Sequence, residues 1–218
     1  MVKIIPTILV KGESEFLNKV KKYEPYFKIA QIDVLDNTLV KSKSWHNFSK
    51  IKKINSKLNY EIHLMVTRPS DYLNELSGFK KIKRVVWHIE AIRDESQMRQ
   101  LLSLAKKNKW QTGLAINPET PVSKITPWLL SFNVILVMTV EPGKNGAKFQ
   151  PRTLTKIKQL AKRVGPYKIA ADGGISDATA PKVAAAGARI LSSGSFLNQG
   201  EIKSQLTKLQ NAIKEIKT

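Results

Sequence analysis

The chain contains no cysteine, and only 17 of its 218 residues are acidic. The lack of cysteine excludes disulfide bonds, thiolate metal sites and a cysteine nucleophile, and it fits a protein kept in a reducing cytoplasm. No apolar run reaches the roughly 18 residues that span a bilayer. The first residues also lack a basic segment followed by a long apolar stretch. We therefore expect a soluble, unexported, cytoplasmic protein with no membrane partner.

The scarcity of acidic residues leaves a formal net charge of +20, because lysine and arginine number 37. A field of this sign attracts phosphates, nucleic acids and other polyanions. The lysines are scattered from Lys3 to Lys217, and no zinc-finger spacing or aromatic-rich RNA-binding signature accompanies them. The charge therefore predicts a solvated cationic surface with no dedicated nucleic-acid site. It leaves room for non-specific, salt-sensitive binding of polyanions.

No linker or low-complexity segment divides the chain, and short runs rich in valine and isoleucine alternate with segments of helical periodicity. The expected strands are residues 3–9, 29–35, 60–65, 84–88, 112–116, 134–138, 168–171 and 189–193. The expected helices are residues 14–22, 45–54, 69–76, 95–109, 121–130, 152–164, 177–186 and 201–216. Eight strand–helix units in 218 residues predict an α/β protein, a single-domain (β/α)8 TIM barrel spanning residues 1–218. The sequence allows a homo-oligomer but does not indicate one.

Polar residues gather at the carboxyl ends of these strands, where the loops of such a barrel meet at one mouth. They are Thr7, Gln31, Asp33, Asp36, His63, His88, Glu90, Asn117 and Asp172. A charged residue within a buried strand needs a partner, so Asp33 and Asp172 are expected to face one another across the mouth. Each alone could be a helix cap or a hydrogen-bonded loop aspartate. Their joint placement with His63 favours a site. For His88 and Glu90, a structural hydrogen bond is the favoured interpretation.

Small residues follow the sixth, seventh and eighth expected strands. They are Gly143, Lys144, Asn145 and Gly146, then Gly173 and Gly174, then Gly194 and Ser195. Glycine lets main-chain N–H groups approach an anion closely. Each turn alone is explained by a tight strand–helix connection, but three successive ones predict a phosphate site.

Eight segments, in this order and at these separations, resemble the ribulose-phosphate 3-epimerase family over nearly the whole chain. They are residues 6–9, 32–36, 62–65, 87–91, 117–121, 138–143, 172–174 and 193–195. The resemblance implies an isomerase of carbohydrate metabolism on a TIM barrel. Its substrate would be a phosphorylated ketose, and the implied reaction interconverts ribulose 5-phosphate and xylulose 5-phosphate.

The resemblance also implies roles for single residues. Asp33 and Asp172 would exchange protons with the substrate from opposite faces. One divalent metal ion between them would stabilise the enediolate, and the sequence does not distinguish zinc, manganese, iron and magnesium. His63 would bind metal and substrate, while Thr7, Met65 and Met138 would contact the substrate.

The metal ligands depart from the family pattern of two histidines and two aspartates. Asp33, His63 and Asp172 match, but Gln31 stands at the remaining histidine position. Gln31 could ligate only through its neutral amide oxygen, which would weaken binding of transition metals. The alternatives are a metal-free site in which Gln31 donates hydrogen bonds, a barrel acting on another ketose phosphate, and a non-catalytic sugar-phosphate binder.

Two further comparisons with family patterns bear on function. Lys144 and Asn145 replace an aromatic residue and a glycine, which predicts altered loop closure or substrate preference. A related decarboxylase and synthase group carries Asp-x-Lys-x-x-Asp at the second strand. Here Leu35 stands at the lysine position between Asp33 and Asp36, so that chemistry is disfavoured.

Overall fold

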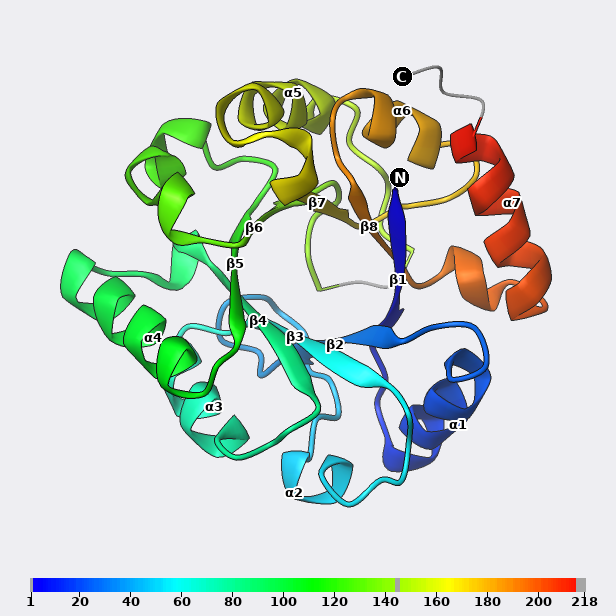
Figure 1. Ribbon diagram of the computed structural model, residues 1–218, viewed down its shortest axis with the longest axis horizontal. Coiled ribbons are helices and arrows are strands. Elements are labelled where there is room, and N and C mark those ends of the chain that lie inside the picture. Colours follow the sequence, from blue (N-terminus) through cyan, green and yellow to red (C-terminus); the bar gives the residue numbers. More distant parts are fainter. Residues whose placement is uncertain (1, 144–145, 215–218) are drawn as a thin grey trace.

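The computed structural model describes residues 2–143 and 146–214, and its eight parallel strands form one closed barrel (Figure 1). The strands are β1 Lys3–Ile8, β2 Ile29–Leu35, β3 Asn59–Met65, β4 Ile82–His88, β5 Gln111–Ile116, β6 Val134–Met138, β7 Ile169–Asp172 and β8 Ile190–Ser193. Each strand pairs with the next, and β1 pairs with β8 to close the ring. The predicted single-domain TIM barrel is confirmed.

Helices surround the barrel (Figure 1). They are α1 Glu13–Tyr23, α2 Phe48–Ile51, α3 Pro69–Leu76, α4 Glu95–Lys107, α5 Thr153–Val164, α6 Ala180–Ala185 and α7 Ile202–Lys214. Short 3₁₀ segments are η1 Ile89–Ala91, η2 Val122–Ser131, η3 Pro166–Lys168 and η4 Phe196–Asn198. Among the described residues, no helix has both the length and the apolar character needed to cross a membrane.

Three expected helices differ from what the structure contains. Residues 121–130 form the 3₁₀ segment η2, where Pro127 cannot donate the N–H that an α-helical turn requires. In the 45–54 segment, the Trp45 N–H is bound to the Val10 carbonyl, and α2 begins only after Asn47, which caps it. In the 177–186 segment, the Thr179 hydroxyl accepts from the Ser176 N–H in a local turn, so α6 begins at Ala180.

Alternation along the strands separates two cores. In β2, all seven residues are buried; Ile32 and Val34 pack outward with the helices. The inward residues of the same strand are Gln31 and Asp33, which are polar and equally buried. Because successive strand residues point to opposite faces, an apolar run interrupted at alternate positions sends its polar side chains into the barrel.

The inside of the barrel is filled below the mouth. An ion pair between Arg84 and Glu61 occupies one inner layer, and both side chains are almost wholly inaccessible to solvent. An apolar cluster that includes Val86, Leu136 and Ala170 also fills the interior. The interior is therefore a packed core, and the polar centre lies at its carboxyl end.

Candidate active site

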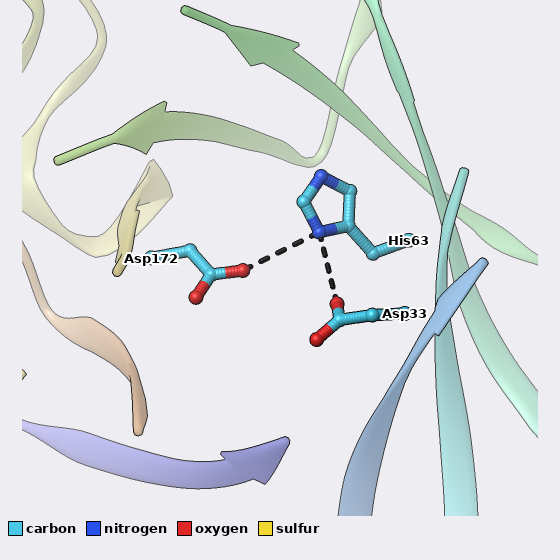
Figure 2. A group of neighbouring side chains, drawn as sticks. All are labelled: Asp33, His63 and Asp172. Carbon is cyan, nitrogen blue, oxygen red and sulfur yellow. Dashed lines mark hydrogen bonds and ion pairs between the residues drawn. The ribbon is translucent and has the colours of Figure 1, made fainter. Parts of the chain in front are cut away.

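Asp33, His63 and Asp172 meet inside the mouth of the barrel, as Figure 2 shows. Asp33 on β2 and His63 on β3 are register partners, which places their side chains together. Asp172 is the last residue of β7, on another side of the ring. His63 Nδ1 lies 3.2 Å from Asp33 Oδ1 and 3.3 Å from Asp172 Oδ2. The structure thus brings together the two aspartates and the histidine that the sequence singled out.

Gln31 completes this cluster with its amide nitrogen rather than its oxygen. Gln31 Nε2 donates to Asp33 Oδ1 at 2.8 Å and to Asp172 Oδ2 at 2.6 Å. On the other side of the amide, Gln31 Oε1 accepts from Ser192 Oγ at 2.7 Å. The opposite orientation would set a carbonyl oxygen against two carboxylate oxygens, so the partners determine which way the amide faces. Sequence reasoning missed Ser192.

The glycine turns lie beside this centre. Gly173 and Gly174 have φ angles of +107° and +62°, which L side chains rarely adopt. A Cβ on Gly173 would lie 2.3 Å from a methyl of Val140, and one on Gly194 would lie 2.2 Å from Thr7 Oγ1. Glycine is therefore required for close backbone approach at both turns.

One cleft joins the glycine turns to the acidic centre. It is lined by both aspartates and by the expected substrate contacts Thr7, Met65, Met138, Gly143, Gly146, Gly173, Gly174, Gly194 and Ser195. Lys144 and Asn145 lie outside the described residues. Asp36, in the loop after β2, is held apart from the centre, since it accepts hydrogen bonds from the Thr38 N–H of the same loop and from the Tyr72 hydroxyl of α3.

Comparison with known proteins identifies the family of this chain. The chain matches the sequence profile of the ribulose-phosphate 3 epimerase family over residues 3–198. The protein belongs to this family. It is 32% identical to a rice protein named ribulose-phosphate 3-epimerase, cytoplasmic isoform, over 94% of this chain and 93% of that protein. It is 31% identical to the ribulose-phosphate 3-epimerase of Methanocaldococcus jannaschii, over 99% of this chain and 92% of that protein.

Solved structures of other barrels resemble this epimerase-family chain in fold alone. A 3-hexulose-6-phosphate synthase from Salmonella typhimurium superposes with a TM-score of 0.71 at 14% identity, covering 98% of this chain and 99% of that one. A tryptophan synthase α-subunit variant from Pyrococcus furiosus gives 0.69 at 14% identity, covering 99% of this chain and 100% of that one. At sequence identities this low, a shared fold does not indicate a shared reaction.

The ribulose-phosphate 3-epimerase family implies a divalent metal, and three side chains have the donors for one. Potential ligand atoms of Asp33, His63 and Asp172 all lie within 4.8 Å of one another, and all three residues are buried. Carboxylate oxygen and imidazole nitrogen suit several divalent ions. Gln31 does not fit as the expected fourth ligand, because it presents N–H groups to the centre and its oxygen is bound by Ser192. The group is able to hold a metal ion, but Gln31 as arranged does not complete it.

Burial and hydrogen bonding set the charges of the centre. Burial alone would lower the pKa of His63, but hydrogen bonds to Asp172 and Asp33 raise it to about 10. Burial raises the pKa of Asp33, while hydrogen bonds from His63 and Gln31 oppose the rise. In this arrangement His63 is an imidazolium at neutral pH, and it balances part of the negative charge of the two aspartates.

A second row of polar groups supports His63 from behind. His63 Nε2 lies 2.9 Å from His88 Nε2, and His88 Nδ1 lies 3.2 Å from Glu90 Oε2. Glu90 Oε1 accepts from the N–H of Asn117, at 2.9 Å, and from the Thr120 hydroxyl. A protonated His63 donates to a neutral His88, which then donates to Glu90. This is the structural hydrogen bonding expected for His88 and Glu90, and it orients the ring of His63.

Proposed function

We propose that this protein is a carbohydrate-phosphate 3-epimerase that interconverts ribulose 5-phosphate and xylulose 5-phosphate. The convergence of Asp33 and Asp172 from different sides of the barrel is the observation that carries the proposal. Inversion at carbon needs one group to take a proton from one face and another to return a proton to the opposite face. Two carboxyl groups lining one cleft meet that need. The names of the curated relatives support the choice of substrate.

In the proposed step, one aspartate carboxylate takes the proton from C3. The C–H electron pair forms the C2–C3 double bond, and the carbonyl oxygen becomes the enediolate oxyanion. The other aspartate, in its acid form, then delivers its proton to the opposite face of C3, and the ketone re-forms. The two carboxyl groups have exchanged protonation states, so the reverse reaction uses the same pair. The upward shift of the Asp33 pKa, caused by burial, supports this residue as a proton carrier.

The remaining residues of the cleft bind and orient. The N–H groups of the glycine turns after β6, β7 and β8 would receive the phosphate, since small residues permit close approach. Met65 and Met138 would form an apolar wall beside the reacting carbons. The Thr7 hydroxyl would bind a substrate oxygen. Asp33, His63 and Asp172 are the residues that would hold the family's divalent metal, a Lewis acid for the enediolate oxygen, but Gln31 does not complete that site and no step described above depends on the ion.

Hydrogen exchange tests this proposal directly. Ribulose 5-phosphate incubated in D₂O with the protein should gain deuterium at C3 and yield xylulose 5-phosphate, as followed by NMR and mass spectrometry. The assay is run with added divalent metal and with chelator. Exchange into a different ketose phosphate, with none into ribulose 5-phosphate, would show that the substrate is wrong. Binding of sugar phosphates without exchange into any of them would show a non-catalytic barrel.

A further inference from the structure

The Gln31 amide nitrogen lies where the three potential metal-ligand atoms converge. It is 2.8 Å from Asp33 Oδ1, 2.6 Å from Asp172 Oδ2 and 3.3 Å from His63 Nδ1. A primary amide nitrogen carries two hydrogens, and the two carboxylates accept both. A single neutral group therefore bridges the two aspartates, in the way that a shared cation bridges a pair of carboxylates.

The bridge engages the inner carboxylate oxygens, Asp33 Oδ1 and Asp172 Oδ2. His63 Nδ1 contacts the same two atoms, at 3.2 Å and 3.3 Å. Each inner oxygen thus faces two nitrogens. The outer oxygens, Asp33 Oδ2 and Asp172 Oδ1, take no part in these contacts, and both side chains line the cleft. The bridge leaves each aspartate with an oxygen for proton transfer to a substrate.

The two carboxylates fix the amide in this orientation. Turning the amide over would replace two charge-assisted hydrogen bonds with repulsion between oxygens. Ser192 Oγ donates to Gln31 Oε1 at 2.7 Å, and both residues are almost completely buried. A hydroxyl can also accept, so Ser192 would pair with either end of the amide. Gln31 can offer its oxygen to a cation only after losing both carboxylate hydrogen bonds. This opposes metal binding at the one position where the chain departs from the family's ligand set.

We propose that Gln31 replaces the divalent metal as the group that holds Asp33 and Asp172 in place, and that the enzyme turns over without a bound metal ion. The inference rests on the epimerase activity proposed above. Gln31 is a positioning residue in this mechanism, because it acts on the substrate through the two aspartates.

Metal binding and activity are measured on the same preparations. Wild-type protein should contain far less than one equivalent of metal by elemental analysis, and chelator should leave deuterium exchange unchanged. Titration with Co²⁺ should give no visible ligand-field absorption. Gln31→His, which restores a second imidazole, should take up about one Co²⁺ per chain with an absorption typical of low coordination number. Circular dichroism checks that this variant is folded.

Ser192→Ala provides a second variant that keeps Gln31 and both aspartates. Because the carboxylates hold the amide, Co²⁺ binding should stay as weak as in wild type. The matched control is Ser193→Ala. Ser193 is buried on the same strand, but its hydroxyl donates to the Ile175 carbonyl at 2.9 Å, away from Gln31. Uptake of Co²⁺ by Ser192→Ala but not by Ser193→Ala would show that Ser192 sets the direction of the amide, and it would overturn the carboxylate bridge.

The outcomes separate this inference from the proposed function. Stoichiometric metal in wild type, with exchange lost on chelation and restored by metal, would overturn the role of Gln31 and leave the epimerase proposal standing. If no ketose phosphate exchanges under any condition, the epimerase proposal fails. The positioning role of Gln31 is then decided by Co²⁺ alone. Equal Co²⁺ binding by wild type and Gln31→His would refute it.

Discussion

The turn after β7 offers a quantitative test of the cleft, through Gly173→Ala. Gly173 has φ +107°, and an added Cβ would lie 2.3 Å from Val140 Cγ2 and 3.0 Å from Val140 Cβ. Rotating the Val140 side chain cannot clear both methyl contacts, because Cγ2 at 2.3 Å and Cγ1 at 2.9 Å are both close and every staggered rotamer leaves a methyl at one of these positions. The backbone is also pinned, because the Thr139 N–H and hydroxyl both donate to the Asp172 carbonyl. The substitution must therefore strain the turn or displace β6.

The stability that Gly173→Ala is expected to lose has two parts, and other variants separate them. A positive φ of this kind costs an L residue about 1–3 kcal/mol. Overpacking in a closed site adds about 1–3 kcal/mol, so Gly173→Ala should lose about 2–6 kcal/mol. Gly165→Ala is the control for the backbone part, because Gly165 has φ +82° and ψ 149°, with nothing within 4 Å of an added Cβ. It should lose only that part, about 1–3 kcal/mol.

Urea unfolding followed by circular dichroism measures both losses, and Val140→Ala completes a double-mutant cycle. In the Val140→Ala background, Gly173→Ala should cost little more than the backbone part, because the methyl groups at 2.3 Å and 2.9 Å are gone and only the 3.0 Å contact with the Cβ of residue 140 remains. The KM for ribulose 5-phosphate should rise in Gly173→Ala and stay unchanged in Gly165→Ala. Equal stability losses for the two glycine variants would refute the close approach of Gly173 to Val140.

Three further predictions concern the centre, its supporting row and the surface. Asp33→Asn and Asp172→Asn should each abolish interconversion of ribulose 5-phosphate and xylulose 5-phosphate in a folded protein, and retained turnover in either would contradict the two-carboxyl mechanism. Burial opposes ionisation of Glu90, but hydrogen bonds from His88, Thr120 and Asn117 lower its pKa to about 2. A lowered carboxyl pKa stabilises the fold above its unfolded value of about 4.3. The stability margin of wild type over Glu90→Gln should thus persist above that pH and disappear as the pH falls towards 2. If the stability difference between wild type and Glu90→Gln does not change with pH in acid unfolding curves, the hydrogen bonds do not stabilise Glu90 in its ionised form. Finally, the charge of +20 predicts retention on heparin that falls steeply with salt, and salt-independent retention would contradict a non-specific electrostatic origin.

The barrel could be read from local pattern, because its strands are buried on both sides and their apolar runs stand out from the amphipathic segments between them. The expected limits of β2 and β6 agree with the structure residue for residue. The helix expected over residues 45–54 is longer than the observed α2, for a physical reason. A distant backbone hydrogen bond from Trp45 to Val10 holds its first residues outside the helix, and no local periodicity records such a contact.

The meeting of Asp33, His63 and Asp172 was also predictable. Parallel strands of a closed barrel deliver the residues at their carboxyl ends to one mouth, so knowing the strand ends is enough to place these side chains together. The direction of the Gln31 amide was not. Its nitrogen and oxygen are nearly the same in shape, and which one faces the centre depends on the carboxylates of Asp33 and Asp172. Asp172 lies 141 residues away along the chain. Only the closed ring of strands brings that carboxylate to the amide, so tertiary structure alone decides whether Gln31 offers the centre an acceptor or two donors.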